Sequence, residues 1–447
     1  MKRRRVLAAA TAGLVSLAGC SGVSTTDATA QPTPTDEWSS VCHDPHNTNH
    51  NPRAAPPTTE PRVRWRVTDH VRVSDAAETT HVGSQPRPVL TGGRLYLGGE
   101  RLTCYDAVTG QRLWRRSRDG RFVAGLAVAG DRLYAVERTT ADSDATPTGQ
   151  LSVVDPTTGA RSHTTACGER PLTPATDGDR VVVPTHRGHV GFDAAGSRRW
   201  TVTDDARLLP ASSAAFSGDS LYLPMPSQFG RYSRAFDPVG GLTPAPGREW
   251  GFEYRFRQRC RPPAVSADGV VVPLSQIPLP SPRYDTEFQP GLHAYGGDGT
   301  RRWHLPVPTE WMDDDASRLG SYYDVSTPAV ADGVGYVVTS RTHDEDTRSA
   351  QNATLQAFDT ATGTEQWRVT FPGYGGFVPP PVVANGCVYT VLTDTRSDRR
   401  RGRLVAHQVT GDRLWSVSLP GPGYHLAAVG ESLYVTLRNG VVAYGPA

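Results

Sequence analysis

Short apolar runs separated by turn residues recur along the chain from about residue 88 to the C-terminus. Residues 128–136, 330–338 and 383–391 each contain two runs of β-branched or aromatic residues that a Gly-, Asp- or Asn-containing turn divides. This pattern predicts tight β-hairpins. No stretch shows sustained helical periodicity, so the sequence predicts an all-β protein.

Each unit of the pattern continues into a third and a fourth apolar run, joined by a second kind of turn. In the clearest copies, residues 106–114 and 359–367, an Asp precedes a Thr-Gly turn and a run that ends on Trp. The Gly supplies the positive φ of a tight turn, and the Trp can fill the space between stacked sheets. Four strands per unit and a period of about fifty residues predict the blades of a β-propeller.

The number of blades follows from the hairpin starts and the terminal Trp residues. Seven complete units begin near Pro88, Leu126, Pro174, Ala214, Pro263, Pro328 and Pro380. Six of these units end at Trp114, Trp200, Trp250, Trp303, Trp367 and Trp415, and the second has His163 instead. An eighth unit, residues 426–444, has three runs, and residues 62–67 supply a fourth. We predict an eight-bladed propeller of four-stranded antiparallel blades, the last closed by N- and C-terminal strands. Seven blades are the alternative, because the second and fourth units are irregular.

The first twenty residues have the features of an export signal. A cationic stretch, residues 2–5, precedes an apolar segment, residues 6–18, that is too short to span a bilayer comfortably. The segment ends in Leu-Ala-Gly-Cys, which resembles the lipobox of prokaryotic lipoproteins and makes Cys20 the predicted lipid-attachment residue. An ordinary cleaved signal or an anchor helix is the alternative. Arg3 and Arg4 also resemble a twin-arginine (Tat) export signal, although a merely basic leader would look similar.

These features divide the chain into three parts. Residues 1–20 are the predicted lipoprotein signal peptide, residues 21–61 a disordered tether and lead-in segment, and residues 62–447 the propeller domain. Residues 21–36 are rich in Thr, Ser, Ala and Pro, which suits a tether. The lipid would hold the domain at the cell membrane, on its extracytoplasmic side.

Charge and cysteine content exclude some classes of function. The formal net charge is +2, so no global field indicates nucleic-acid binding. The basic residues 396–403 are interpreted as a solvated loop. Apart from Cys20 the chain has five cysteines, and this odd number leaves at least one thiol free whatever the disulfide pattern.

The repeated Asp-x-x-Thr-Gly-x-x-x-Trp sequence, with the hairpins before it, resembles the tryptophan-docking repeat of the pyrroloquinoline quinone (PQQ)-like propellers, over roughly residues 62–447. Residues 38–52 also resemble the Trp…Asp…Asn-Thr…Pro lead-in of many such domains. The superfamily includes quinoprotein alcohol and glucose dehydrogenases. It also includes non-enzymatic lipoproteins, such as the propeller lipoprotein of the outer-membrane barrel-assembly machinery.

The resemblance implies two functional branches that differ in their cofactor residues. Quinoprotein dehydrogenases need a PQQ site, usually with a vicinal Cys-Cys disulfide, together with a calcium ion and an Asp base. This chain has no Cys-Cys dipeptide and is short for such enzymes. We therefore assign no catalytic, cofactor-binding or metal residue, and expect neither PQQ nor calcium. The predicted function is a monomeric, non-catalytic platform for an envelope protein. A divergent quinoprotein oxidoreductase or hydrolase is one alternative, and a propeller that binds a small molecule or glycan in its central channel is another.

The longest loops fall on one face of the predicted ring, where each blade's second loop and the connectors between blades lie. Aromatic residues in these loops suit a protein-binding surface. The partner-binding residues that we predict are Trp311, Tyr322, Tyr323, Tyr284 and Phe288. The alternative is that the aromatic side chains pack within their own loops. Cys42, His43, His46 and His50 are spaced like loose metal ligands, but no carboxylate cluster accompanies them, so no metal site is predicted.

Overall fold

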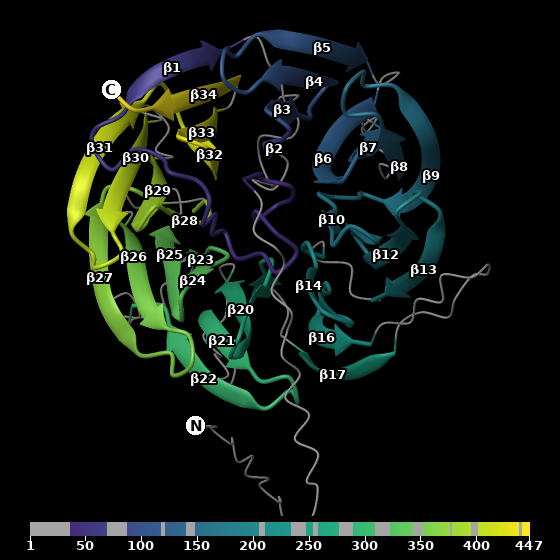
Figure 1. Ribbon diagram of the computed structural model, residues 1–447. Helices are drawn as coiled ribbons and strands as arrows, with labels where there is room; N and C mark the ends of the chain where they lie inside the picture. The colour runs from purple at the N-terminus through teal and green to yellow at the C-terminus, as the bar shows by residue number, and fades with distance from the viewer. Residues whose placement is uncertain are drawn as a thin grey trace, which may run out of the picture.

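The protein is an eight-bladed β-propeller in the computed structural model, which confirms the predicted fold (Figure 1). The described residues are 36–68, 87–117, 121–139, 148–204, 211–233, 247–253, 258–276, 289–308, 322–342, 352–375, 378–394, 401–437 and 440–447. Within these ranges, no helix has both the length and the apolar character needed to cross a membrane.

Each blade is an antiparallel sheet that runs outward from the ring axis. The first four blades are β2 (Val89–Thr91), β3 (Arg94–Leu97), β4 (Arg101–Asp106) and β5 (Arg112–Ser117); β6 (Arg121–Ala129), β7 (Arg132–Thr139), β8 (Thr148–Val154) and β9 (Arg161–Glu169); β10 (Ala175–Thr176), β11 (Arg180–Thr185), β12 (Gly188–Asp193) and β13 (Arg198–Thr203); β14 (Ala215–Ser217), β15 (Ser220–Pro224), β16 (Gln228–Tyr232) and β17 (Arg248–Glu253).

The remaining blades include two extra strands, β18 and β23. They are β18 (Gln258–Cys260), β19 (Ala264–Ser266), β20 (Gly269–Gln276), β21 (Gly291–Tyr295) and β22 (Arg301–Pro306); β23 (Tyr322–Val325), β24 (Ala329–Ala331), β25 (Val334–Thr342), β26 (Asn352–Asp359) and β27 (Glu365–Pro372); β28 (Val382–Ala384), β29 (Cys387–Asp394), β30 (Arg401–Gln408) and β31 (Arg413–Leu419); β32 (Gly423–Val429), β33 (Ser432–Leu437), β34 (Gly440–Gly445) and β1 (Arg62–Val67).

The two ends of the chain close the ring in the last blade. Strand β1 pairs antiparallel with β34, from Arg62 opposite Gly445 to Val67 opposite Val441. Figure 1 shows the purple N-terminal strand beside the yellow C-terminal strand. The shared blade was predicted from the missing fourth run of the eighth unit, and the pairing confirms it.

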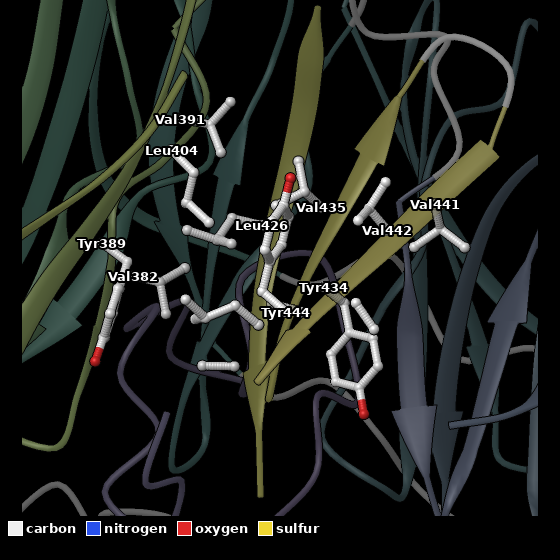
Figure 2. Close-up of a cluster of buried hydrophobic side chains, with 14 of the residues drawn as sticks. Val382, Tyr389, Val391, Leu404, Leu426, Tyr434, Val435, Val441, Val442 and Tyr444 are labelled. Atoms are coloured by element: carbon white, nitrogen blue, oxygen red, sulfur yellow. The ribbon is translucent and has the colours of Figure 1, made fainter. Parts of the chain in front are cut away.

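Apolar side chains fill the space between neighbouring blades. In Figure 2, Tyr389 and Leu404 of the seventh blade lie opposite Leu426 and Val435 of the eighth, and all four side chains are buried. Each blade therefore removes its apolar faces from water only by stacking on its neighbours, as repeat architectures require.

A Trp near the start of most outer strands joins one blade to the next. Trp65 donates its indole N–H to the carbonyl oxygen of Ala107 at 3.1 Å, and the Tyr434 hydroxyl donates to the same oxygen at 3.1 Å. The Trp65 ring covers Gly110, where an added Cβ would lie 2.6 Å from a ring atom. Gly110 has φ +71°, so it serves both the turn and the close approach of the ring.

The same docking recurs around the ring. The indole N–H groups donate to the turn of the following blade in the pairs Trp114–Pro156, Trp250–Gly297, Trp303–Thr360 and Trp367–Val409. Trp415 donates instead to Pro57 O, just before β1, because the eighth blade is closed by the two ends of the chain and has no such turn. In the second blade, where His163 replaces Trp, Tyr134 and Arg132 donate instead to Ala194 O, at 2.9 and 2.8 Å. The degenerate unit thus keeps a hydrogen bond to the same kind of turn.

The five cysteines that the structure describes all carry buried thiols, and none forms a disulfide. These residues are Cys42, Cys104, Cys167, Cys260 and Cys387. Blade stacking and the closing strand, rather than covalent cross-links among these residues, therefore stabilise the ring.

Replacing Trp65 with Ala should weaken the closure between the last blade and the first. We expect the free energy of unfolding to fall by about 2–4 kcal/mol, because a large, partly buried ring and its hydrogen bond are lost. Trp65→Phe is the control, since it keeps most of the packing and should cost about 1 kcal/mol. Denaturant unfolding followed by fluorescence measures both; equal stability of Trp65→Ala and the wild type would contradict the docking role.

Candidate functional site

The lead-in to the propeller lies inside the ring. Residues 36–57, here called the axial segment, run through the centre of the ring as the purple trace in Figure 1. Trp38, Cys42, Asn47, Asn49 and Asn51 are all at most 2% exposed. The boundary predicted at residue 62 placed this segment in the lead-in before the propeller; residues 36–57 lie within the ring and most of them are buried or partly buried.

The axial segment makes one circuit of the ring, in the order of the blades. Its carbonyl oxygens accept hydrogen bonds from the N–H groups of innermost-strand residues. The donor–acceptor pairs are Leu90–Trp38, Val128–Ser39, Phe216–Pro45, Val265–His46, Val330–Thr48 and Val383–Asn49, with N···O distances of 2.8–2.9 Å. Each donor occupies an equivalent position on the strand nearest the axis. The segment therefore behaves as a shared edge partner for strands that would otherwise face the axis unpaired.

Three Asn side chains add hydrogen bonds to backbone carbonyls of the inner strands or of the residues just before them. The Asn47 amide donates to the carbonyls of Ala214 and Pro263, both at 3.0 Å. Asn49 donates to Pro328 O at 3.2 Å, and Asn51 donates to Ala428 O at 2.9 Å. An amide has two donors, so one side chain can join two neighbouring blades.

Local interactions give the axial segment its curved backbone. Asn47 and Asn49 have φ values of +58° and +48°, a region that Asn adopts more readily than most residues. The Asp44 carboxylate accepts the backbone N–H of Thr48 at 2.9 Å, and also its hydroxyl. Burial alone would raise the pKa of Asp44, but the nearby His43 ring and hydrogen bonds from Thr48 hold it below its usual value. Asp44 is therefore ionised at neutral pH and fixes this turn.

The axial segment enters and leaves by the same face. Asp36 accepts the N–H of Gly430, and Glu37 accepts the hydroxyl of Thr91, both in first-hairpin turns. At its other end, Pro57 O accepts hydrogen bonds from Tyr389 and Trp415. We call this side, formed by the first and third hairpin turns, the turn face. The opposite side, formed by the second loops and the blade connectors, is the loop-bearing face.

A buried ion pair lies at the loop-bearing end of the axis. Arg261, just before β19, donates from Nη2 to both carboxylate oxygens of Asp324 on β23, and from Nε to one of them. Asp324 also accepts the Ser275 hydroxyl at 2.9 Å. The two side chains are 7% and 1% exposed. Both oxygens of Asp324 are thus occupied by its own chain, which makes this carboxylate a structural anchor rather than a free base.

A second guanidinium approaches this pair. Arg87, just before β2, donates from Nη1 to Val41 O at 3.3 Å and lies 4.0 Å from the Cys42 sulfur. Burial lowers the pKa of Arg87, and the charge of Arg261 lowers it further. Burial raises the pKa of the Cys42 thiol, although Arg87 opposes the shift, so the thiol is neutral at pH 7.

The structure describes only some of the predicted partner-binding residues. Tyr284, Phe288 and Trp311 lie outside the described residues, as does the lipid-attachment residue Cys20. The backbone of Tyr322 is described, as the first residue of β23, but its side chain is not. Tyr323, expected in a loop, is a strand residue whose side chain is 7% exposed and packs in the core between blades. The reason is that β23 pairs with both β20 and β25, which draws this connector into the sheets of two blades.

The four residues with metal-like spacing belong to the axial segment. Cys42, His43 and His46 are buried, and burial lowers the pKa of both His46 and His50. Among the residues that the structure describes, no three His, Cys, Asp or Glu side chains come close enough together to hold a metal ion. The spacing instead reflects the path of the segment past successive blades.

Sequence reasoning missed the role of the three axial Asn residues. Asn47, Asn49 and Asn51 alternate along the chain, and this period-two pattern of amides was the available signal. Arg87, Arg261 and Asp324 carried no such signal, because each stands alone in a different connector and only the ring brings them together.

Comparisons with known proteins agree with this fold. The family model described as outer membrane protein assembly factor BamB matches residues 59–201 and 351–446. The solved structure of BamB from Moraxella catarrhalis is 14% identical, with a TM-score of 0.55, over 87% of this chain and 98% of that chain. A europium-containing methanol dehydrogenase is 12% identical, with a TM-score of 0.54, over 89% of each chain.

Propellers of other kinds are similar to a comparable degree. The C-terminal WD40 domain of Sif2 is 9% identical, with a TM-score of 0.54, over 87% of this chain and 99% of that chain. At these identities the solved structures show a shared fold. A search of curated proteins gives no significant match.

Replacing Asn47 with Ala should loosen the axial segment. We expect a loss of about 2–3 kcal/mol in the free energy of unfolding, because the buried Ala214 and Pro263 carbonyls lose their donor. The amides of Phe216 and Val265 should also exchange hydrogen faster, since they donate to the same stretch of the segment. Thr410→Ala, in an exposed turn, is the control and should change stability by no more than about 0.5 kcal/mol. Unchanged exchange at both amides would refute the inferred role.

Proposed function

Because the chain belongs to the PQQ-like propeller family whose model is described as outer membrane protein assembly factor BamB, matched over more than half of its length, we propose that it is a membrane-anchored, non-catalytic platform for a protein partner. The partner binds on the loop-bearing face. The chain acts as a monomer, and Cys20 carries a lipid that tethers it on the extracytoplasmic side of the envelope, after Tat export.

The difference between the two faces carries this proposal. On the turn face, short turns pack under the Trp side chains of the neighbouring blades. On the loop-bearing face, β18 and β23 add to the blades, and β23 joins β20 to β25 in one ten-stranded sheet. Extra β structure across two blades gives a rigid support for binding loops, and a rigid scaffold limits the entropy lost on association.

The filled axis favours a face over the channel as the binding surface. A small molecule or glycan bound among the innermost strands would compete with residues 36–57, which already accept hydrogen bonds from six of those strands. The occupied axis therefore favours the platform over a ligand bound within the central channel.

The residues near the axis do not fit a quinoprotein site with calcium. Calcium requires several oxygen ligands, often carboxylates. Both oxygens of Asp324 are bonded to Arg261, and the described residues include no cluster of three potential ligands of the His, Cys, Asp or Glu type. We therefore propose that the protein works without PQQ or calcium, and no step of an oxidation is assigned to it.

Replacing Cys20 with Ser tests the membrane tether. We expect the variant to move from the membrane fraction to the soluble extracytoplasmic fraction, because the thiol that receives the lipid is lost. Ser21→Ala is the matched control and should remain with membranes. Fractionation with detection of the full chain measures the distribution; continued membrane attachment of Cys20→Ser would rule out the lipid anchor.

Partner capture tests the platform. The full chain, purified from detergent-solubilised membranes, should retain an envelope protein, and Trp311→Ala with Tyr284→Ala should reduce that capture at least tenfold. Val108→Ala changes a side chain that is 66% exposed on the turn face, and it should leave capture unchanged. The melting temperature of each variant checks folding. Undiminished capture by the double variant, or recovery of only a sugar or quinone, would overturn the proposal.

A further inference from the structure

Among the described residues, Arg87 at the loop-bearing end of the axis forms no ion pair, whereas Arg261 does. Arg261 is neutralised by Asp324, which it binds through two nitrogens. For Arg87, the contacts are a backbone carbonyl, Val41 O, and the neutral thiol of Cys42. Among the described residues, no carboxylate lies within 4.0 Å of the Arg87 guanidinium.

Arg87 keeps N–H donors free and is partly exposed by its accessible surface. A guanidinium has five N–H donors in a planar fork, and the contacts of Arg87 use only Nη1. Its side chain is partly exposed, whereas Arg261 and Asp324 behind it are buried. A charge in such a partly dry site interacts strongly with an anion, because little water screens it.

The surrounding contacts hold this fork in position. Arg87 directly precedes β2, Arg261 precedes β19, and Val378, whose N–H points to Asp324 at 3.4 Å, precedes β28. Asp324 and Thr327 precede β24, and the Thr327 hydroxyl donates to Pro262 O at 3.0 Å. Residues from four blades thus converge at the loop-bearing end of the axis, and the carbonyl of Val41 in the axial segment accepts a hydrogen bond from Arg87.

We propose that Arg87 is the centre of an anion-binding site for a single carboxylate, with Arg261 as a fixed second positive charge behind it. The excess of one positive charge matches a monoanion, whereas a phosphate dianion would leave a buried negative charge. The free side of the guanidinium fork can bind the two oxygens of a carboxylate side by side. The site stands independently of the platform proposal, since a small carboxylic acid or an acidic group of a polypeptide could supply the ligand.

Trifluoroacetate is the probe that tests the site. Titrated into the full chain at constant ionic strength, it should show saturable broadening of its fluorine NMR signal, reversed by acetate but not by chloride. Arg87→Gln should weaken the apparent affinity at least tenfold, and Arg87→Lys should weaken it less, because Lys keeps the charge but loses the fork. Arg53→Gln, at an exposed position near the turn face, is the control and should bind as the wild type does.

Partner capture with the same variants identifies the source of the carboxylate. Loss of both trifluoroacetate binding and capture in Arg87→Gln supports an acidic group of a polypeptide, and loss of trifluoroacetate binding alone supports a small acid. Equal broadening in the wild type and in folded Arg87→Gln overturns the site, as does broadening that chloride abolishes equally well. If Arg87→Gln melts far below the wild type, Arg87→Lys carries the comparison. If neither the wild type nor any variant captures a partner, the platform proposal is contradicted. The trifluoroacetate titration then still tests the anion site by itself.

Discussion

The contact between the Trp of one outer strand and the turn of the next blade is the interaction on which the ring depends. It combines a large apolar ring, a glycine that lets the ring approach, and an N–H bond to a turn carbonyl, as in Trp65, Gly110 and Ala107. A blade alone has two apolar faces and no means of covering them. Because the same contact recurs at most junctions around the ring, it holds successive blades together and favours the curvature that closes the circle.

The repeat explains why the fold was predictable. The Asp at 106 and at 359 accepts the N–H groups of its own Thr-Gly turn, so the phrase that recurs in the sequence is the one that shapes each docking turn. The shared last blade could be predicted because the last unit has only three of its four apolar runs at the C-terminus. Residues 62–67 form a further run that belongs to no other unit. The second blade kept its place although His163 departs from the pattern, since Tyr134 and Arg132 reach the same turn.

The axis could not be predicted in the same way. Residues 36–57 occur once, are mostly polar and have no apolar period, so apart from the alternating Asn residues nothing local indicates burial. Their partners are backbone groups of blades up to 394 residues away. The Arg87, Arg261 and Asp324 group depends on the ring to assemble it. Tyr323 was expected on an exposed loop, but its connector forms a strand that pairs with both neighbouring blades. Repeated patterns therefore predict the architecture, whereas the roles of single residues depend on which other residues the closed ring brings next to them.

The axial segment also determines how a pull on the N-terminus would act. Since the segment enters and leaves by the turn face, it is a loop laid into the ring rather than a thread drawn through it, and it can be withdrawn without opening a blade. Its bonds lie in chain order, from Trp38 to Asn51, so tension at Asp36 would load them one after another. Under such tension the hydrogen bonds of the axial segment would break one at a time, at low force. The hydrogen bonds between the strands of a blade would share the load by comparison, so the blades would stay intact.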